Sequence, residues 1–143
     1  MKVVINNKYG GFSLSPEGVM RYAEIKGITL YPEADEKWKS LNIVTYWKCP
    51  PDQRPKVLKD SDFYAASLDE RKASNLAYNE ATLDDRGIER DDPALVQVVE
   101  EMGDAACGRH ASLKVVEIPD DVKWQIEEYD GLEWVAEVHR TWN

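Results

Sequence analysis

Asp130 and Gly131 separate two segments in which apolar and polar residues alternate, VKWQIEEY at 122–129 and LEWVAEV at 132–138. An Asp-Gly pair between alternating segments is the strongest short-range signal for a β-hairpin, because a type I′ turn needs positive φ angles at both of its central residues. The segment SLKVVEI at 112–118 is a further strand, and the turn after it is too short for a helical crossover. These three strands are therefore expected to run antiparallel, which makes an all-parallel α/β fold an unsuitable description.

The alternation also predicts which side chains of the hairpin face the core. The side chains expected to face the core are Trp124, Ile126, Leu132 and Trp134. The glutamates expected to face solvent are Glu127, Glu133 and Glu137. The acidic residues of the hairpin are therefore interpreted as a solvated surface rather than a catalytic or metal-binding site.

Further elements precede the hairpin. Strands are predicted at 2–6, 28–31 and 42–47, and helices at 16–25, at 68–78 and from Pro93 to a stop at Gly108. The side chains on the inner side of the first helix are predicted to be Val19, Met20, Tyr22 and Ala23. Residues 48–67, with three prolines in CPPDQRP, and residues 81–92 are predicted to be connections.

Together these elements predict an α+β fold, with a mainly antiparallel sheet, a C-terminal Asp-Gly hairpin and two to three helices packed on the sheet. Residues 1–143 are expected to form a single domain, as the length prior favours. An irregular insertion at about 48–91 is a candidate functional segment, because long connections in a compact domain are often functional.

The chain is acidic, and its charge is uneven. Its net charge is −9, and residues 93–143 contain 11 acidic and 4 basic side chains. Such a surface argues against direct binding to nucleic acid or to anionic membranes, which needs clustered Lys and Arg. No apolar run approaches the length of about 20 residues that spans a bilayer, and the N-terminal segment has no apolar signal region. We therefore expect a cytoplasmic protein without a membrane partner.

Few residues suggest catalysis. Cys49 and Cys107 are far apart in the sequence and are interpreted as two reduced thiols. His110 and His139 stand in no recognisable zinc-binding or nucleophile context. No catalytic residue, metal site or cofactor is predicted.

The candidate ligand-binding residues lie in two regions. Gly10 and Gly11, beside Phe12, come between a strand and a helix start, where backbone N–H groups can hold a phosphate or carboxylate; a plain turn is the alternative interpretation. The aromatic and basic residues of the middle region, with Arg71 and Asn75, are typical of a nucleotide-binding cleft or a protein interface, although core and surface roles also explain them. Arg109, after the third helix, is a further candidate.

Three sequence stretches resemble a family of short phage and prophage proteins, and together with their surroundings they cover about two thirds of the chain. These stretches are KVVIN…GGFSLS, IERDDPALVQVVEEMG and LKVVEIPDDVKWQIEEYDGLEWVAEVHRTW. The resemblance implies a phage context and the host cytoplasm. In size, phage origin and α+β composition the chain is also similar to the Thoeris anti-defence sponges, which are oligomers that sequester cyclic ADP-ribose-type signals without cleaving them. No ligand residue of those proteins is carried over to this sequence.

Three hypotheses for the function follow. The first is a non-enzymatic, homo-oligomeric binding protein that sequesters a small phosphorylated, nucleotide-derived signal in counter-defence. The second is an acidic inhibitor or DNA mimic that binds a host defence protein. The third is a small enzyme that acts on nucleotides.

Overall fold

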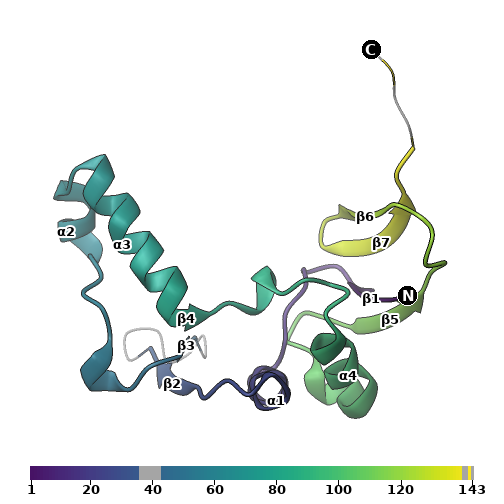
Figure 1. The fold of residues 1–143 in the computed structure, drawn as a ribbon, viewed down its shortest axis with the longest axis horizontal. Helices are drawn as coiled ribbons and strands as arrows, with labels where there is room; N and C mark the ends of the chain where they lie inside the picture. The colour runs from purple at the N-terminus through teal and green to yellow at the C-terminus, as the bar shows by residue number, and fades with distance from the viewer. Residues whose placement is uncertain (36–42, 140–141, 143) are drawn as a thin grey trace. The chain divides into compact units, whose positions relative to one another are not determined.

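The computed structural model describes residues 1–35, 43–139 and 142, which form two compact units. Unit 1 contains Met1–Gly27 and Asp85–Asn143, and unit 2 contains Ile28–Asp84. The described residues include four α-helices and seven β-strands, and every strand pair is antiparallel (Figure 1). The α+β prediction is confirmed, whereas the single domain and the role of residues 48–91 stay predictions.

Unit 1 contains the main core. Strand β1 (Lys2–Asn6) pairs with β5 (Leu113–Glu117), so the purple N-terminal strand lies beside a green strand from the second half of the chain in Figure 1. Helices α1 (Pro16–Lys26) and α4 (Pro93–Met102) pack against each other, and α4 also contacts both strands. The largest fully buried apolar side chains of this unit are those of Val3, Val4, Leu95 and Val98.

Both helices of unit 1 begin where the sequence predicts. The Ser15 Oγ accepts a hydrogen bond from the Gly18 amide at 3.0 Å, and Asp92 caps α4, with a proline at the first helical position in each case. Met20 on α1 is 39% exposed, so the prediction that it faces inward is wrong. The prediction that α4 continues to Gly108 is also wrong, because Gly103 adopts a positive φ of 56° and the chain changes there to a 3₁₀ turn, Gly103–Ala106.

The hairpin lies where it was expected, but its faces differ from the prediction. Strands β6 (Trp124–Tyr129) and β7 (Leu132–Glu137) pair around the Asp-Gly turn. Tyr129 pairs with Leu132, so every even-numbered residue of β6 shares a face with an odd-numbered residue of β7. Ile126 therefore lies opposite Val135, not beside Trp134.

The register changes the face predicted for four residues of β7: Leu132 and Trp134 lie on the face opposite to Ile126, and Glu133 and Glu137 lie on the face of Ile126. Trp134 lies opposite Glu127 and is 42% exposed, so it does not face the core. Glu133 shares the face of Ile126, and its side chain is only 9% exposed, so it does not face solvent. The alternation within each strand was identified correctly. Across a two-residue turn, however, the even-numbered residues of one strand share a face with the odd-numbered residues of the other.

Unit 2 contains a small three-stranded sheet with the order β2-β3-β4. Its strands are β2 (Tyr31–Ala34), β3 (Val44–Trp47) and β4 (Thr82–Leu83). The strand predicted at 28–31 is found three residues later, at Tyr31–Ala34. It includes Pro32, which is tolerated there because β2 is an edge strand. Position 42 of the next predicted strand lies outside the described residues, and β4 was not predicted.

Helices occupy much of the segment predicted to be irregular. Helix α2 (Asp60–Ala65) was not predicted, and α3 (Leu68–Ala81) begins where expected but extends three residues beyond position 78. The prediction of a continuous connection over 48–67 is therefore wrong. Helix α2 begins without a side-chain cap and at a residue with positive φ, so the usual start signal is missing.

Candidate functional site

Three segments of unit 1 meet around the glycine pair that follows β1. The Gly10 amide donates to the Asp130 carbonyl oxygen at 3.2 Å, and a Cβ added to Gly10 would lie 2.7 Å from the His110 carbonyl oxygen. These contacts join parts of the chain that are about 100 residues apart. We call residues 9–11, 109–110 and 129–131 the glycine-loop surface.

The turn of the hairpin is packed directly on the glycine loop. Gly131 has a φ of 88°, and a Cβ added to it would lie 2.2 Å from the Gly11 nitrogen. A side chain at this position would be strained by the backbone and would clash with Gly11. Glycine at 131 therefore allows the two loops to approach each other closely.

The Asn6 side chain links these segments through hydrogen bonds. It is completely buried, and its Nδ2 donates to the carbonyl oxygens of Lys8 and Gly131, each at 2.7 Å. Its Oδ1 accepts from the Ser112 amide at 2.9 Å. Because all of these bonds are made within the protein, the amide fixes the relative positions of the three segments.

A buried ion pair supports the same region. The Arg90 guanidinium donates to both carboxylate oxygens of Glu133, at 2.6 and 2.9 Å, and lies 3.7 Å from the centre of the Phe12 ring. The Glu133 carboxylate also accepts from the Asn6 amide at 2.7 Å. The bidentate geometry and the stacking are typical of arginine and anchor the hairpin to β1.

Two exposed tyrosines border the glycine-loop surface. Tyr9 is 58% exposed and Tyr129 is 70% exposed, and their rings meet edge to face with centroids 6.5 Å apart. Arg109 and His110 are exposed on the adjoining segment. Exposed aromatic rings can stack on nucleobases, and a guanidinium can bind a phosphate, so this arrangement combines two groups that recognise a nucleotide.

The structure separates the predicted ligand-binding residues. Gly10, Gly11 and Arg109 belong to the glycine-loop surface, whereas Phe12 is 8% exposed and lies under Arg90. Arg71 and Asn75 belong to α3 in unit 2. Arg71 donates to the carbonyl oxygens of Phe63 and Tyr64, and Asn75 is exposed.

Several supporting residues were not identified from the sequence. The role of Glu133 can be found by pairing the two strands across a two-residue turn, which places it on the inner face. The same pairing places Tyr129 beside the turn. The contacts of Asn6 and Arg90 join segments that are distant in the sequence, so no local pattern reveals them.

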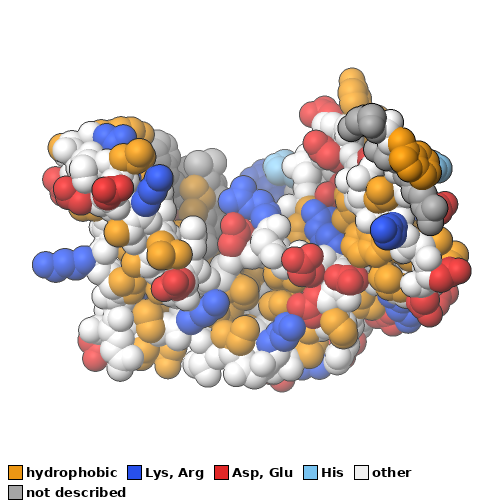
Figure 2. All heavy atoms as spheres, turned by 45° about the horizontal axis from the view of Figure 1, so that its top comes forward, with side chains coloured by type: hydrophobic (Ala, Val, Ile, Leu, Met, Phe, Trp, Pro, Cys, Tyr) orange, Lys and Arg blue, Asp and Glu red, His pale blue; other side chains and the backbone are white. Residues whose placement is uncertain are grey.

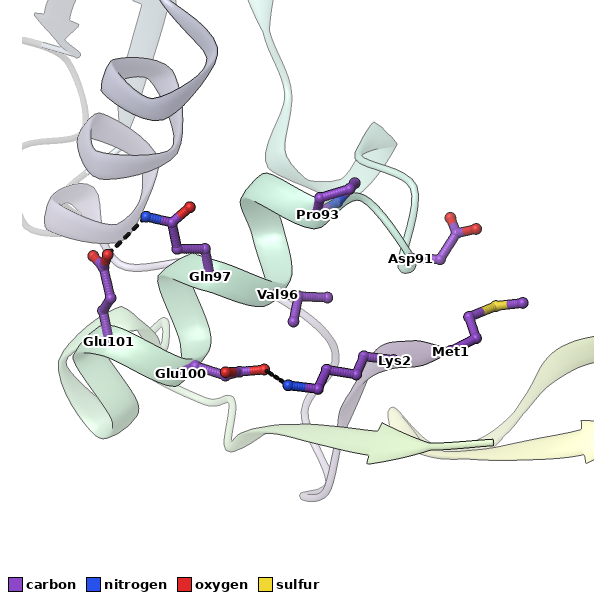
Figure 3. A pocket seen from close by; sticks show the side chains of 8 residues that line it. All are labelled: Met1, Lys2, Asp91, Pro93, Val96, Gln97, Glu100 and Glu101. Atoms are coloured by element: carbon purple, nitrogen blue, oxygen red, sulfur yellow. Dashed lines mark hydrogen bonds and ion pairs between the residues drawn. The ribbon is translucent and has the colours of Figure 1, made fainter. Parts of the chain in front are cut away.

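A recess of unit 1 with a volume of about 720 Å³ lies between the start of the chain and α4 (Figure 3). Its lining residues are Met1, Lys2, Asp91, Pro93, Val96, Gln97, Glu100 and Glu101. Lys2 pairs with Glu100 at 2.8 Å, and Gln97 donates to Glu101 at 2.8 Å. Its lining residues include three with carboxylate side chains and one lysine, so this recess is less suited to an anion than the glycine-loop surface. Acidic side chains are also spread among exposed hydrophobic ones on the face that Figure 2 shows.

The pKa values of Tyr22 and Asp92 are shifted because the two side chains lie in one polar cluster at the start of α4. Asp92 accepts from the Tyr22 hydroxyl at 2.7 Å and pairs with Lys26 at 3.1 Å. Burial, together with the Asp92 carboxylate, raises the pKa of Tyr22. Burial alone would raise the pKa of Asp92, but the hydrogen bonds from Tyr22, Lys26 and the Ala94 amide outweigh it and lower that pKa.

Comparisons with family models, with curated proteins and with solved structures found no match to this chain. Within residues 1–35, 43–139 and 142, no three His, Cys, Asp or Glu side chains are grouped so that they could hold a metal ion. In the same residues, none of the helices has the length and apolar character needed to cross a membrane.

Proposed function

We propose that the protein is a non-enzymatic binding protein that sequesters a nucleotide-derived signal of the cyclic ADP-ribose or cyclic-nucleotide type. The proposal includes action as a homo-oligomer in phage counter-defence, in the cytoplasm of the host. The observation that carries it is the glycine-loop surface, where two exposed tyrosines adjoin a segment with Arg109 and His110. The phage context is supported by the sequence resemblance alone.

The chemistry of the surface explains how binding would proceed. Tyr9 and Tyr129 offer exposed rings for the base, and Arg109 offers a guanidinium for a phosphate group. The buried Asn6 and the ion pair of Arg90 with Glu133 hold the loops in place before the ligand arrives. Such preorganisation lowers the entropic cost of binding.

Isothermal titration calorimetry with cyclic ADP-ribose, with a cyclic dinucleotide and with ATP tests this proposal. At least one of the cyclic compounds is expected to bind, and mass spectrometry should recover it unchanged after the protein is denatured. Tyr129→Ala should weaken binding about tenfold, since stacking of a base on an aromatic ring contributes about 1–3 kcal/mol. Arg109→Gln should weaken it about tenfold or more, as expected for a hydrogen bond to a charged group.

The matched control is Tyr64→Ala, because Tyr64 is 76% exposed and belongs to unit 2. This variant should retain the affinity of the wild type. Absence of binding heat with all three compounds would reject the proposal. Recovery of a cleaved compound would favour a nucleotide-acting enzyme instead.

A second candidate function is binding to a host defence protein through the outer face of the hairpin. Trp134 is 42% exposed, and its indole N–H donates to the Glu127 carboxylate at 3.1 Å. An exposed tryptophan that is hydrogen-bonded to a carboxylate suits a protein interface, where aromatic residues are enriched. This face includes Glu127, but not the buried Glu133.

A photo-crosslinking residue in place of Trp134 tests this second candidate in cells that contain the host defence system. A crosslink to one host protein is expected, and the charge reversal Glu127→Lys should remove it. The same crosslinking residue in place of Tyr64 provides the control. If both positions capture the same proteins, the outer face of the hairpin has no specific partner.

A further inference from the structure

Helix α3 buries very little of its surface. Ser74 is its only buried residue, whereas Leu68 is 64% exposed and Leu76 is 59% exposed. A helix in a folded protein gains most of its stability by packing an apolar face. The described part of unit 2 has only two buried hydrophobic side chains, Leu30 and Trp47, so its own core is small.

The exposed leucines of α3 belong to a regular row of side chains. Leu68, Lys72, Leu76 and Glu80 follow one another at intervals of four residues, and all four are exposed. Residues at this spacing form a ridge along one side of a helix. We call these four residues the α3 ridge.

The α3 ridge is complementary to itself. When two copies of the ridge run antiparallel about a two-fold axis at Leu76, the Leu76 side chains of the two copies face each other. Lys72 of each copy then lies opposite Glu80 of the other, and Leu68 lies beyond the end of the facing helix at Ala81. The ridge has one positive and one negative charge, so two copies can meet there although each chain has a net charge of −9.

We propose that the α3 ridge is a self-association surface, on which a second copy of this chain packs its own α3 helix in antiparallel orientation. The contact is isologous, since the same residues are used by both copies and a two-fold axis relates them. It buries Leu76 against the Leu76 of the other copy and places two Lys72–Glu80 pairs on either side of it. Self-association through α3 does not depend on the identity of any ligand.

Analytical ultracentrifugation of the full chain over a range of concentrations tests the proposal by charge exchange. The wild type is expected to be a dimer, and the single variants Lys72→Glu and Glu80→Lys should each weaken the dimer at least tenfold. The double variant with both changes should recover the dimer, because the opposite charges are again placed near each other. Circular dichroism should show that the helix content of each variant is retained.

The control is Lys56→Glu, which makes the same charge change at an exposed position outside α3. This variant should associate as the wild type does. A monomeric wild type would overturn the proposal, and so would a dimer that both single variants leave unchanged. Failure of the double variant to recover, with its helix content intact, would also overturn it.

Discussion

Replacing Glu133 with alanine is expected to destabilise unit 1 by about 3 kcal/mol. The Glu133 carboxylate accepts two hydrogen bonds from Arg90 and one from the Asn6 amide. Removing it leaves the buried Asn6 amide without its acceptor, and it leaves the Arg90 guanidinium, which is 18% exposed, with only its 3.4 Å hydrogen bond to the Val4 carbonyl oxygen among those described. Breaking a buried ion pair on one side costs about 3–5 kcal/mol, and the remaining exposure of Arg90 places the expected value at the lower end.

Amide hydrogen exchange along β1 measures this cost locally. A loss of about 3 kcal/mol should speed exchange of the β1 amides by about 100-fold when exchange is limited by the opening equilibrium. Glu137→Ala is the matched control, because Glu137 lies in the same strand and is exposed. The change at Glu137 should cost no more than about 0.5 kcal/mol.

A double-mutant cycle separates the ion pair from other effects. Arg90→Ala and Glu133→Ala should each destabilise the unit, and the double variant should be less destabilised than the sum of the two. The reasoning about the buried pair is refuted if Glu133→Ala speeds exchange no more than Glu137→Ala does. It is also refuted if the two single effects simply add.

Two further predictions concern the loops and the helix caps. Gly131→Ala should destabilise unit 1 by more than about 1 kcal/mol, because Gly131 has a positive φ and the added Cβ would clash with Gly11. Gly87→Ala should have little effect, since nothing lies near the position of its Cβ. Urea unfolding compares the two variants, and equal effects would contradict the close packing at Gly131. The pKa of Asp92 is lowered in the folded protein, so its contribution is present above the unfolded value of 3.8 and is lost as the pH falls through the lower folded value. Asp92→Asn should therefore lower the melting temperature at pH 7 and differ less from the wild type at pH 2, and a difference that stays constant with pH would contradict the role of its pairing with Lys26.

The sequence was most informative where a local rule has a clear geometric meaning. The Asp-Gly turn located the hairpin, and Ser15 and Asp92 located the starts of two helices. The same turn contained the information needed to place Glu133 on the inner face, since a two-residue turn fixes the parity of the two strands. The incorrect assignment of Trp134 therefore came from applying alternation to each strand separately.

Other features could not be read from local patterns. Helix α2 has no side-chain cap, and it follows a proline-rich stretch that favours a loop. The glycine-loop surface depends on contacts between residues about 100 positions apart, such as Gly10 with Asp130 and with His110. Propensity and periodicity describe neighbours within a few positions, so a surface assembled from such distant segments lies beyond their reach.

The pairing of β1 with β5 has a consequence for the order in which the chain folds during its synthesis. Lys2 pairs with Glu117, so the first strand has no partner until most of the chain has left the ribosome. Unit 2 is one continuous segment, Ile28–Asp84, and its contacts close over shorter loops. We expect unit 2 to become compact during translation, whereas the apolar β1 can pair only after β5 has been synthesised. We therefore expect the apolar side chains of the nascent β1 to stay exposed until β5 has been synthesised.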